Sequence, residues 1–154
     1  AMPTTVTRLV GRPFVANPTA NYAKLRTAYC VASTLRSGKL TQADFSAAAL
    51  REPDVCQLAS NIEIVADDNP DPNAIGPATL TLKLRDGREL SKTIQYALGH
   101  PENPMTTQQR LDKFWSCWEL AELDAAQGTE LLALVDDLEN NEAAGDLPEL
   151  LQPR

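Results

Sequence analysis

Residues 79–96 carry the alternation of apolar and polar side chains that most constrains how this chain can fold. Leucines occupy every second position from Leu80 to Leu84, and the pattern resumes with Leu90 after Asp86-Gly87. Period-two alternation places the apolar side chains of a strand on one face. The segment therefore predicts a hairpin of two antiparallel strands, which needs cover on one face only.

The loop of this hairpin decides which leucines face each other. A two-residue Asp86-Gly87 loop would put the apolar sets of the two strands on opposite faces of the sheet, which pleating penalises. A three-residue loop at 85–87 instead places Leu82 opposite Leu90 on one face. Its third position favours a left-handed residue, and Gly87 stands there. We therefore predict the three-residue loop, with a positive φ at Gly87.

Helical periodicity, capping residues and prolines predict the other elements. We expect a helix at 21–37, with Asn21 as its N-cap and Gly38 ending it, and a second at 41–50, capped by Thr41 or Ser46. Further helices are expected at 53–60, at 129–140 and from Thr106 onward, where Gln109 is the capping-box partner of Thr106. Strands are expected at 5–10 and 62–66, and loops at 11–19 and 67–77. Trp115 and Trp118 share one apolar stripe of the helix after Thr106 and are expected in a core. This order predicts an α+β fold in which a small antiparallel sheet packs with several helices.

Size and charge narrow the function classes. The chain has 154 residues and a net charge of −7, so one domain with a real core is expected. Residues 119–149 hold ten acidic residues and no Lys or Arg. Such a surface repels phosphate, which argues against a nucleic-acid partner. No apolar run approaches the roughly 20 residues of a membrane-spanning helix, so no membrane partner is expected.

The cysteines and the histidine give little support to a metal or redox site. Cys30, Cys56 and Cys117 are widely spaced, without a Cys-x-x-Cys pair. We read them as thiols in a reducing, cytoplasmic compartment, where buried cysteines act as small hydrophobes. A metal site built on the single histidine, His100, would need partners that the sequence does not reveal.

Four residues are candidates for chemistry, each with a plainer alternative. His100 lies in a predicted turn, where it either forms a structural hydrogen bond or acts as a general acid or base. Tyr29 lies on the inner face of the 21–37 helix, as a core residue or with its hydroxyl in a cleft. Lys24 and Arg26, on the same helix, are either solvated or able to bind a substrate carboxylate, for which Arg has the better geometry.

One further motif joins a proline-braced turn to a helix start. It reads Gly99-His100-Pro101-Glu102-Asn103-Pro104-Met105-Thr106, with Lys113-Phe114 following. Together with Asn21-Tyr22-Ala23-Lys24-Leu25, the stretch from Tyr29 through Leu35 to Gly38, and Asp86-Gly87, it resembles the C-terminal part of the MmgE/PrpD family. That family includes 2-methylcitrate dehydratase and cis-aconitate decarboxylase. The resemblance spans most of residues 5–140, which leaves 1–4 as an added remnant or tail and 141–154 as an acidic tail.

The resemblance implies an architecture and a chemistry. Family members have a large all-helical domain and a smaller α+β lid domain, with the active site between them and no metal or nucleotide cofactor. Their principal acid/base residues lie in the helical domain. The chain would then be the lid of a lyase acting on a small di- or tricarboxylic acid, inactive by itself, with Tyr29 matching the tyrosine that faces the cleft. The resemblance also implies a homodimer as a common arrangement. The alternative is a stand-alone, non-catalytic domain that binds a separately encoded helical partner.

Overall fold

In a computed structural model that describes residues 1–140, 145 and 147–152, the alternating segment forms the hairpin of β1 (Ala78–Lys83) and β2 (Glu89–Ile94). The strands are antiparallel, and Leu82 faces Leu90. The N–H of Leu84 donates to the carbonyl of Arg88 at 2.8 Å, which closes a loop of three residues. Gly87 has a φ of 86°. The predicted loop length, register and left-handed glycine are all confirmed.

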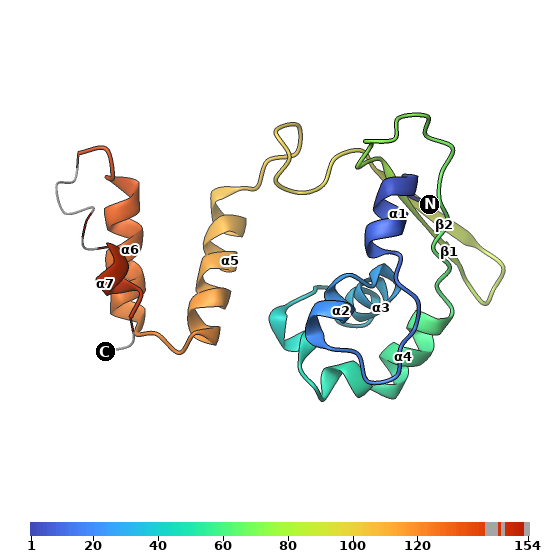
Figure 1. Cartoon of the computed structure of the whole chain (residues 1–154), viewed down its shortest axis with the longest axis horizontal. Coiled ribbons are helices and arrows are strands. Elements are labelled where there is room, and N and C mark those ends of the chain that lie inside the picture. Colours follow the sequence, from blue (N-terminus) through green and yellow to red (C-terminus); the bar gives the residue numbers. More distant parts are fainter. Residues whose placement is uncertain (141–144, 146, 153–154) are drawn as a thin grey trace. The chain divides into compact units, whose positions relative to one another are not determined.

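The described residues group into two compact units, 1–97 and 98–154 (Figure 1). The first contains α1 (Thr4–Val10), α2 (Ala20–Lys24), α3 (Thr27–Ser37), the 3-10 turns η1 (Gln42–Phe45) and η2 (Ala49–Arg51), α4 (Pro53–Ser60), β1 and β2. The second contains α5 (Thr107–Leu120), α6 (Ala125–Asp136) and α7 (Leu147–Leu150). Helices with one two-stranded antiparallel sheet confirm the predicted α+β class.

The helix expected at 21–37 is interrupted near its start. Thr19, not Asn21, caps α2, because its Oγ1 accepts a hydrogen bond from the N–H of Tyr22 at 3.2 Å. At Arg26 the backbone becomes extended, with φ −107° and ψ 91°, and forms an antiparallel bridge with Gly11. This long-range pairing takes Arg26 out of the helix, a change that helical periodicity could not predict. The termination of α3 at Gly38, in the left-handed conformation, is confirmed.

Both short strands expected near the hairpin are wrong. Residues 4–10 form α1, whose first turn closes when the N–H of Thr7 donates to the carbonyl of Pro3 at 2.9 Å. Threonine and valine favour strands only weakly, and tertiary context overrides that preference here. In the segment 62–66, Ala66 forms an isolated bridge with Met2, and no strand forms.

The first two residues lie along the edge of β1 that faces away from β2. The ammonium of Ala1 donates to the carbonyl of Thr79 at 2.7 Å, and the N–H of Thr79 donates back to Ala1 at 2.8 Å. Met2 bonds on its other side, donating to the carbonyl of Val65 and accepting from the N–H of Asp67. Residues 1–2 therefore lie between β1 and residues 65–67.

Four further predicted helices test the capping arguments. The segment 41–50 forms η1 and η2 rather than one helix, although Thr41 does cap η1 in a capping box with Asp44. Helix α4 spans the predicted residues, with its proline in the first turn. Thr106 and Gln109 form the predicted capping box of α5. The last long helix begins at Ala125, earlier than expected, because Asp124 caps it by accepting from the N–H of Ala126 at 2.7 Å.

Each unit has its own apolar core. In the first, α3 packs against α4; the buried members are Ala23, Tyr29, Ala32, Leu50, Val55 and Ala59. In the second, Trp118 is buried as predicted, and its indole N–H donates to the carbonyl of Asp124 at 2.9 Å. Leu131 and Leu134 of α6 and Leu150 of α7 complete this core.

Two sequence expectations meet the limits of the described residues. Of the expected acidic tail, residues 141–144, 146 and 153–154 lie outside them. Among the residues that are described, none of the helices combines the length and apolar composition needed to cross a bilayer.

We expect Gly87→Val to lower the free energy of unfolding by about 1–2 kcal/mol, because a side chain with a Cβ resists the left-handed conformation. Urea unfolding followed by circular dichroism measures the change. Arg85→Val is the matched control, since Arg85 is in the same exposed loop without a positive φ. Equal losses in the two variants would contradict the argument from φ.

We expect Gly128→Ala to destabilise the second unit, although alanine is the better helix former by up to about 1 kcal/mol. A Cβ at Gly128 would lie 2.6 Å from the ring of Trp115, and overpacking of this kind costs about 1–3 kcal/mol. Both tryptophans are on α5, so their fluorescence during urea unfolding reports on this unit. Gly145→Ala, where nothing lies within 4 Å, is the control. A more stable Gly128→Ala variant would refute the clash.

Candidate functional site

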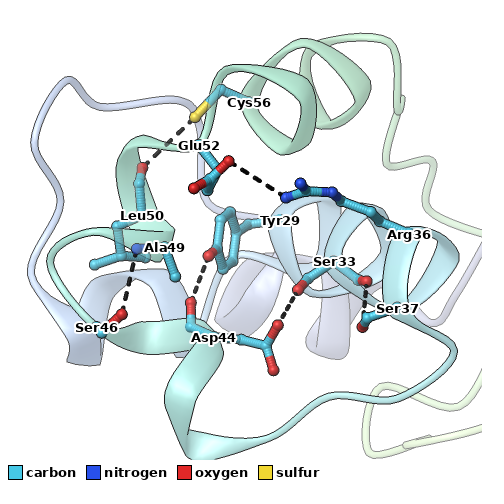
Figure 2. Close-up of polar contacts among 10 residues, drawn as sticks. All are labelled: Tyr29, Ser33, Arg36, Ser37, Asp44, Ser46, Ala49, Leu50, Glu52 and Cys56. Atoms are coloured by element: carbon cyan, nitrogen blue, oxygen red, sulfur yellow. Dashed lines mark hydrogen bonds and ion pairs between the residues drawn. The ribbon is translucent and has the colours of Figure 1, made fainter.

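Tyr29 occupies the centre of the first unit. It lies in the first turn of α3 and is only 2% exposed, with its ring centre 6.0 Å from that of Phe45. Its hydroxyl donates to the backbone carbonyl of Asp44, as Figure 2 shows. Burial, and secondarily the negative charge of Asp44, raises the pKa of Tyr29 to about 12. The phenol is therefore protonated and engaged within the unit's own core.

Asp44 ties this tyrosine to its surroundings. Its carboxylate accepts hydrogen bonds from the Ser33 hydroxyl at 2.6 Å and from the Thr41 N–H at 2.7 Å (Figure 2 draws the first). Burial alone would raise the pKa of Asp44, but these hydrogen bonds outweigh it and lower the pKa below its ordinary value. A charged Asp44 therefore fixes η1 against α3 and positions the backbone carbonyl that accepts the hydrogen bond from the Tyr29 hydroxyl.

Arg26 lies beside Tyr29 and is buried to an unusual degree for an arginine. It is 5% exposed, and its guanidinium carbon lies 5.1 Å from the centre of the Phe14 ring. Its Nε is buried, and no described residue accepts a hydrogen bond from it. A buried cation without a partner anion is costly. The arrangement therefore suits an arginine that receives an anion from outside.

Arg26 and Tyr29 line the same hollow, of about 240 Å³. We call it the Arg26 hollow. Its lining residues are Phe14, Val15, Ala16, Asn17 and Pro18 of the connector, together with Ala23, Arg26, Tyr29, Leu50, Arg51 and Cys56. Two arginines and no carboxylate stand among them. The hollow is therefore electropositive and suited to a carboxylate or another small anion.

A second hollow, of about 200 Å³, is also lined by Tyr29 but carries a different set of charges. Its arginine, Arg36, already forms an ion pair with Glu52 at 3.5 Å, and Asp44 adds another negative charge (Figure 2). Both partners of the ion pair are about half exposed. This second hollow therefore lacks the uncompensated positive charge that distinguishes the Arg26 hollow.

The structure brings some predicted site residues together and leaves others apart. Lys24 does not line the Arg26 hollow; its ammonium lies 5.5 Å from the centre of the Phe45 ring. The thiol of Cys56 borders the hollow and donates to the carbonyl of Leu50 at 3.5 Å. Burial raises the pKa of the Cys30 thiol, so Cys30 is protonated at neutral pH. Among the described residues, no group of three His, Cys, Asp or Glu side chains could hold a metal ion.

Sequence reasoning missed Arg51 and Phe14. Arg51 ends η2 and follows the buried Leu50. Its sequence context does not distinguish Arg51 from a solvated surface arginine. Phe14 is an exposed aromatic residue in an irregular connector and was assigned no role. Both reach the Arg26 hollow only because of the tertiary fold.

The Gly99-to-Pro104 motif forms a tight turn in the second unit. Gly99 has a φ of 95°, and its N–H donates to the carbonyl of Asn103 at 2.8 Å. His100 Nδ1 accepts from the N–H of Glu102 at 3.1 Å, and the N–H of Asn103 donates to the His100 carbonyl at 2.8 Å. In the helix that follows, Phe114 stacks on Trp118 with ring centres 5.2 Å apart, next to the exposed Lys113. These contacts give the motif a clear structural function.

We expect Tyr29 to make stability fall with rising pH between its two pKa values. The unfolded tyrosine ionises near 10.0 and the folded one near 12, so the stability present below pH 10 is lost as pH rises through 12. Two pKa units correspond to about 2–3 kcal/mol. Urea unfolding at pH 8 and at higher pH should show a smaller loss for Tyr29→Phe than for the unaltered chain. Tyr22→Phe is the control; if it flattened the slope equally, the assignment to Tyr29 would fail.

Comparison with known proteins agrees with the sequence resemblance. The model of the MmgE/PrpD C-terminal domain matches residues 1–138. A search of curated proteins found no match. The family match covers most of the chain, including the hairpin, the Arg26 hollow and the Gly99-to-Pro104 turn. The chain therefore belongs to the MmgE/PrpD family, of which it is the C-terminal domain.

Proposed function

We propose that this chain is the lid domain of an MmgE/PrpD-type lyase acting on a small di- or tricarboxylic acid, and that the Arg26 hollow receives one carboxylate of the substrate. The observation that carries the proposal is the buried guanidinium of Arg26, whose Nε has no partner among the described residues. A carboxylate would supply the missing charge and accept hydrogen bonds from the guanidinium edge, which is geometrically suited to it.

Such a contact would serve the chemistry of the family. Removal of a proton next to a carboxylate pushes negative charge toward that carboxylate, before water or carbon dioxide leaves. A fixed cation stabilises the developing charge, and it does so most strongly where water is excluded. Phe14 beside the Arg26 guanidinium limits water on that side. The general base would come from the helical domain, so we expect the isolated chain to bind the substrate without converting it.

Tyr29 lines both hollows. In this arrangement its hydroxyl donates a hydrogen bond to the backbone carbonyl of Asp44, so it could donate to a substrate only after that hydrogen bond breaks. A catalytic role for Tyr29 stays a prediction. The binding role of Arg26 does not depend on it.

We expect Arg26→Gln to weaken binding of propane-1,2,3-tricarboxylate, an unreactive tricarboxylate, by roughly tenfold or more, because a charge-assisted hydrogen bond is lost. Nitrogen-15 NMR titration of the 154-residue chain measures this, with the Nε–Hε signal of Arg26 as direct reporter. Arg36→Gln is the matched control, since Arg36 faces the neighbouring hollow and is paired with Glu52. The Arg36 variant should bind like the unaltered chain.

Two results would contradict the proposal. One is an Arg26 signal that does not move as the tricarboxylate is added to the unaltered chain. The other is equal weakening by Arg26→Gln and Arg36→Gln, which would indicate attraction by overall charge and not a specific site. Conversion of 2-methylcitrate or cis-aconitate by the chain alone would refute the assignment of the base to another domain.

A further inference from the structure

Beyond Thr79, which pairs with Ala1, the edge of strand β1 that faces away from β2 is not paired with any described residue. Alternate residues of a strand direct their N–H and C=O groups to opposite edges. Thr79 directs both groups to Ala1, on the side away from β2. By alternation, Thr81 and Lys83 direct theirs to the same side. At that edge, neither forms a backbone hydrogen bond with any other described segment.

An apolar groove of about 260 Å³ borders this edge. Its lining residues include Ala1 and Met2, together with the apolar side chains of Val31, Ile64, Leu80 and Ile94. Leu80 is 38% exposed and Ile94 is 44% exposed. A two-stranded sheet with uncovered leucines is marginal by itself, and its open edge invites further pairing.

We propose that the free edge of β1 and this groove bind the polypeptide segment leading into Ala1, which adds a third strand antiparallel to β1. The inference rests on the proposed function, in which a helical domain is joined ahead of the lid, and on the family match, which includes the residues 1–4 that the sequence resemblance left as an added remnant or tail. Ala1 already occupies a ladder position, so the next residue upstream starts at the edge. At about 3.4 Å per residue, four upstream residues run past Leu80, Thr81, Leu82 and Lys83.

The Ala1–Thr79 pair also sets the register of the added strand. The first and third residues upstream of Ala1 lie opposite Leu80 and Leu82, on the face that carries the groove. These positions therefore take apolar, preferably β-branched, side chains. The second and fourth upstream residues lie opposite Thr81 and Lys83 and exchange backbone hydrogen bonds with them. Their side chains lie on the opposite, hydroxyl-rich face, where Thr79 contacts Thr93.

The experiment extends the full chain by four residues ahead of Ala1. The sequence Thr-Val-Thr-Val puts valine at the first and third upstream positions, over the groove. The matched control, Val-Thr-Val-Thr, has the same composition but puts threonine there. Amide hydrogen exchange of Thr81 and Lys83, followed by NMR, is the measurement. We expect at least tenfold slower exchange at both amides with Thr-Val-Thr-Val, and a much smaller change with the control.

Three outcomes would overturn the inference. Unchanged exchange with Thr-Val-Thr-Val would show that the edge does not accept the leading segment. Equal protection by both extensions would show that the groove does not select the predicted face. Concentration-dependent protection in the unextended chain would assign the edge to a second copy instead. None of these involves Arg26, so the carboxylate titration separates failure of this inference from failure of the proposed function.

Discussion

The backbone pairing of Gly11 with Arg26 is the constraint on which the candidate site depends. It interrupts what would otherwise be one helix and turns Arg26 from a surface position into a buried one. Only glycine fits on the other side of the bridge, because a Cβ at Gly11 would lie 2.5 Å from the carbonyl of Thr7. The connector that follows Gly11 then passes over the buried guanidinium and lines the Arg26 hollow. The pairing of Gly11 with Arg26 thus positions both the Arg26 guanidinium and the connector residues that lie over it.

A hydrogen-bond network around Asp44 holds the elements next to this site together. The chain of hydrogen bonds from Thr41 and Ser33 to the Asp44 carboxylate, and from Tyr29 to the Asp44 carbonyl, joins η1 to α3. Every group in it is satisfied, as a buried polar network requires. Arg26, a few residues away on the same chain segment, is the contrast: its Nε is buried and unpaired. The contrast is therefore between a buried polar network with satisfied hydrogen bonds and a buried Arg26 Nε that has no partner among the described residues, which is the pattern expected of a ligand-binding group.

The free edge of β1 and the Arg26 hollow present the same first unit to two different kinds of partner. The hollow offers charge to a small anion, whereas the groove beside β1 offers apolar surface and unpaired backbone groups to an extended segment. Under the proposed function, the hollow would contact the substrate and the groove would contact the segment that joins the chain to a helical domain.

The sequence by itself determined the features that depend on neighbouring residues. The three-residue loop with Gly87, the capping box of Thr106 and Gln109, and the end of α3 at Gly38 follow from local φ preferences and short-range hydrogen bonds. The family resemblance could also be recognised from the sequence, because the Gly99-to-Pro104 motif is a contiguous stretch. Tertiary structure alone decided the rest. Residues 4–10 became a helix, the helix at 21–37 broke at Arg26, and Arg51 reached the Arg26 hollow. Each of these outcomes depends on contacts between segments distant in the chain, whose energies outweigh local propensity and leave no periodic signal in the sequence.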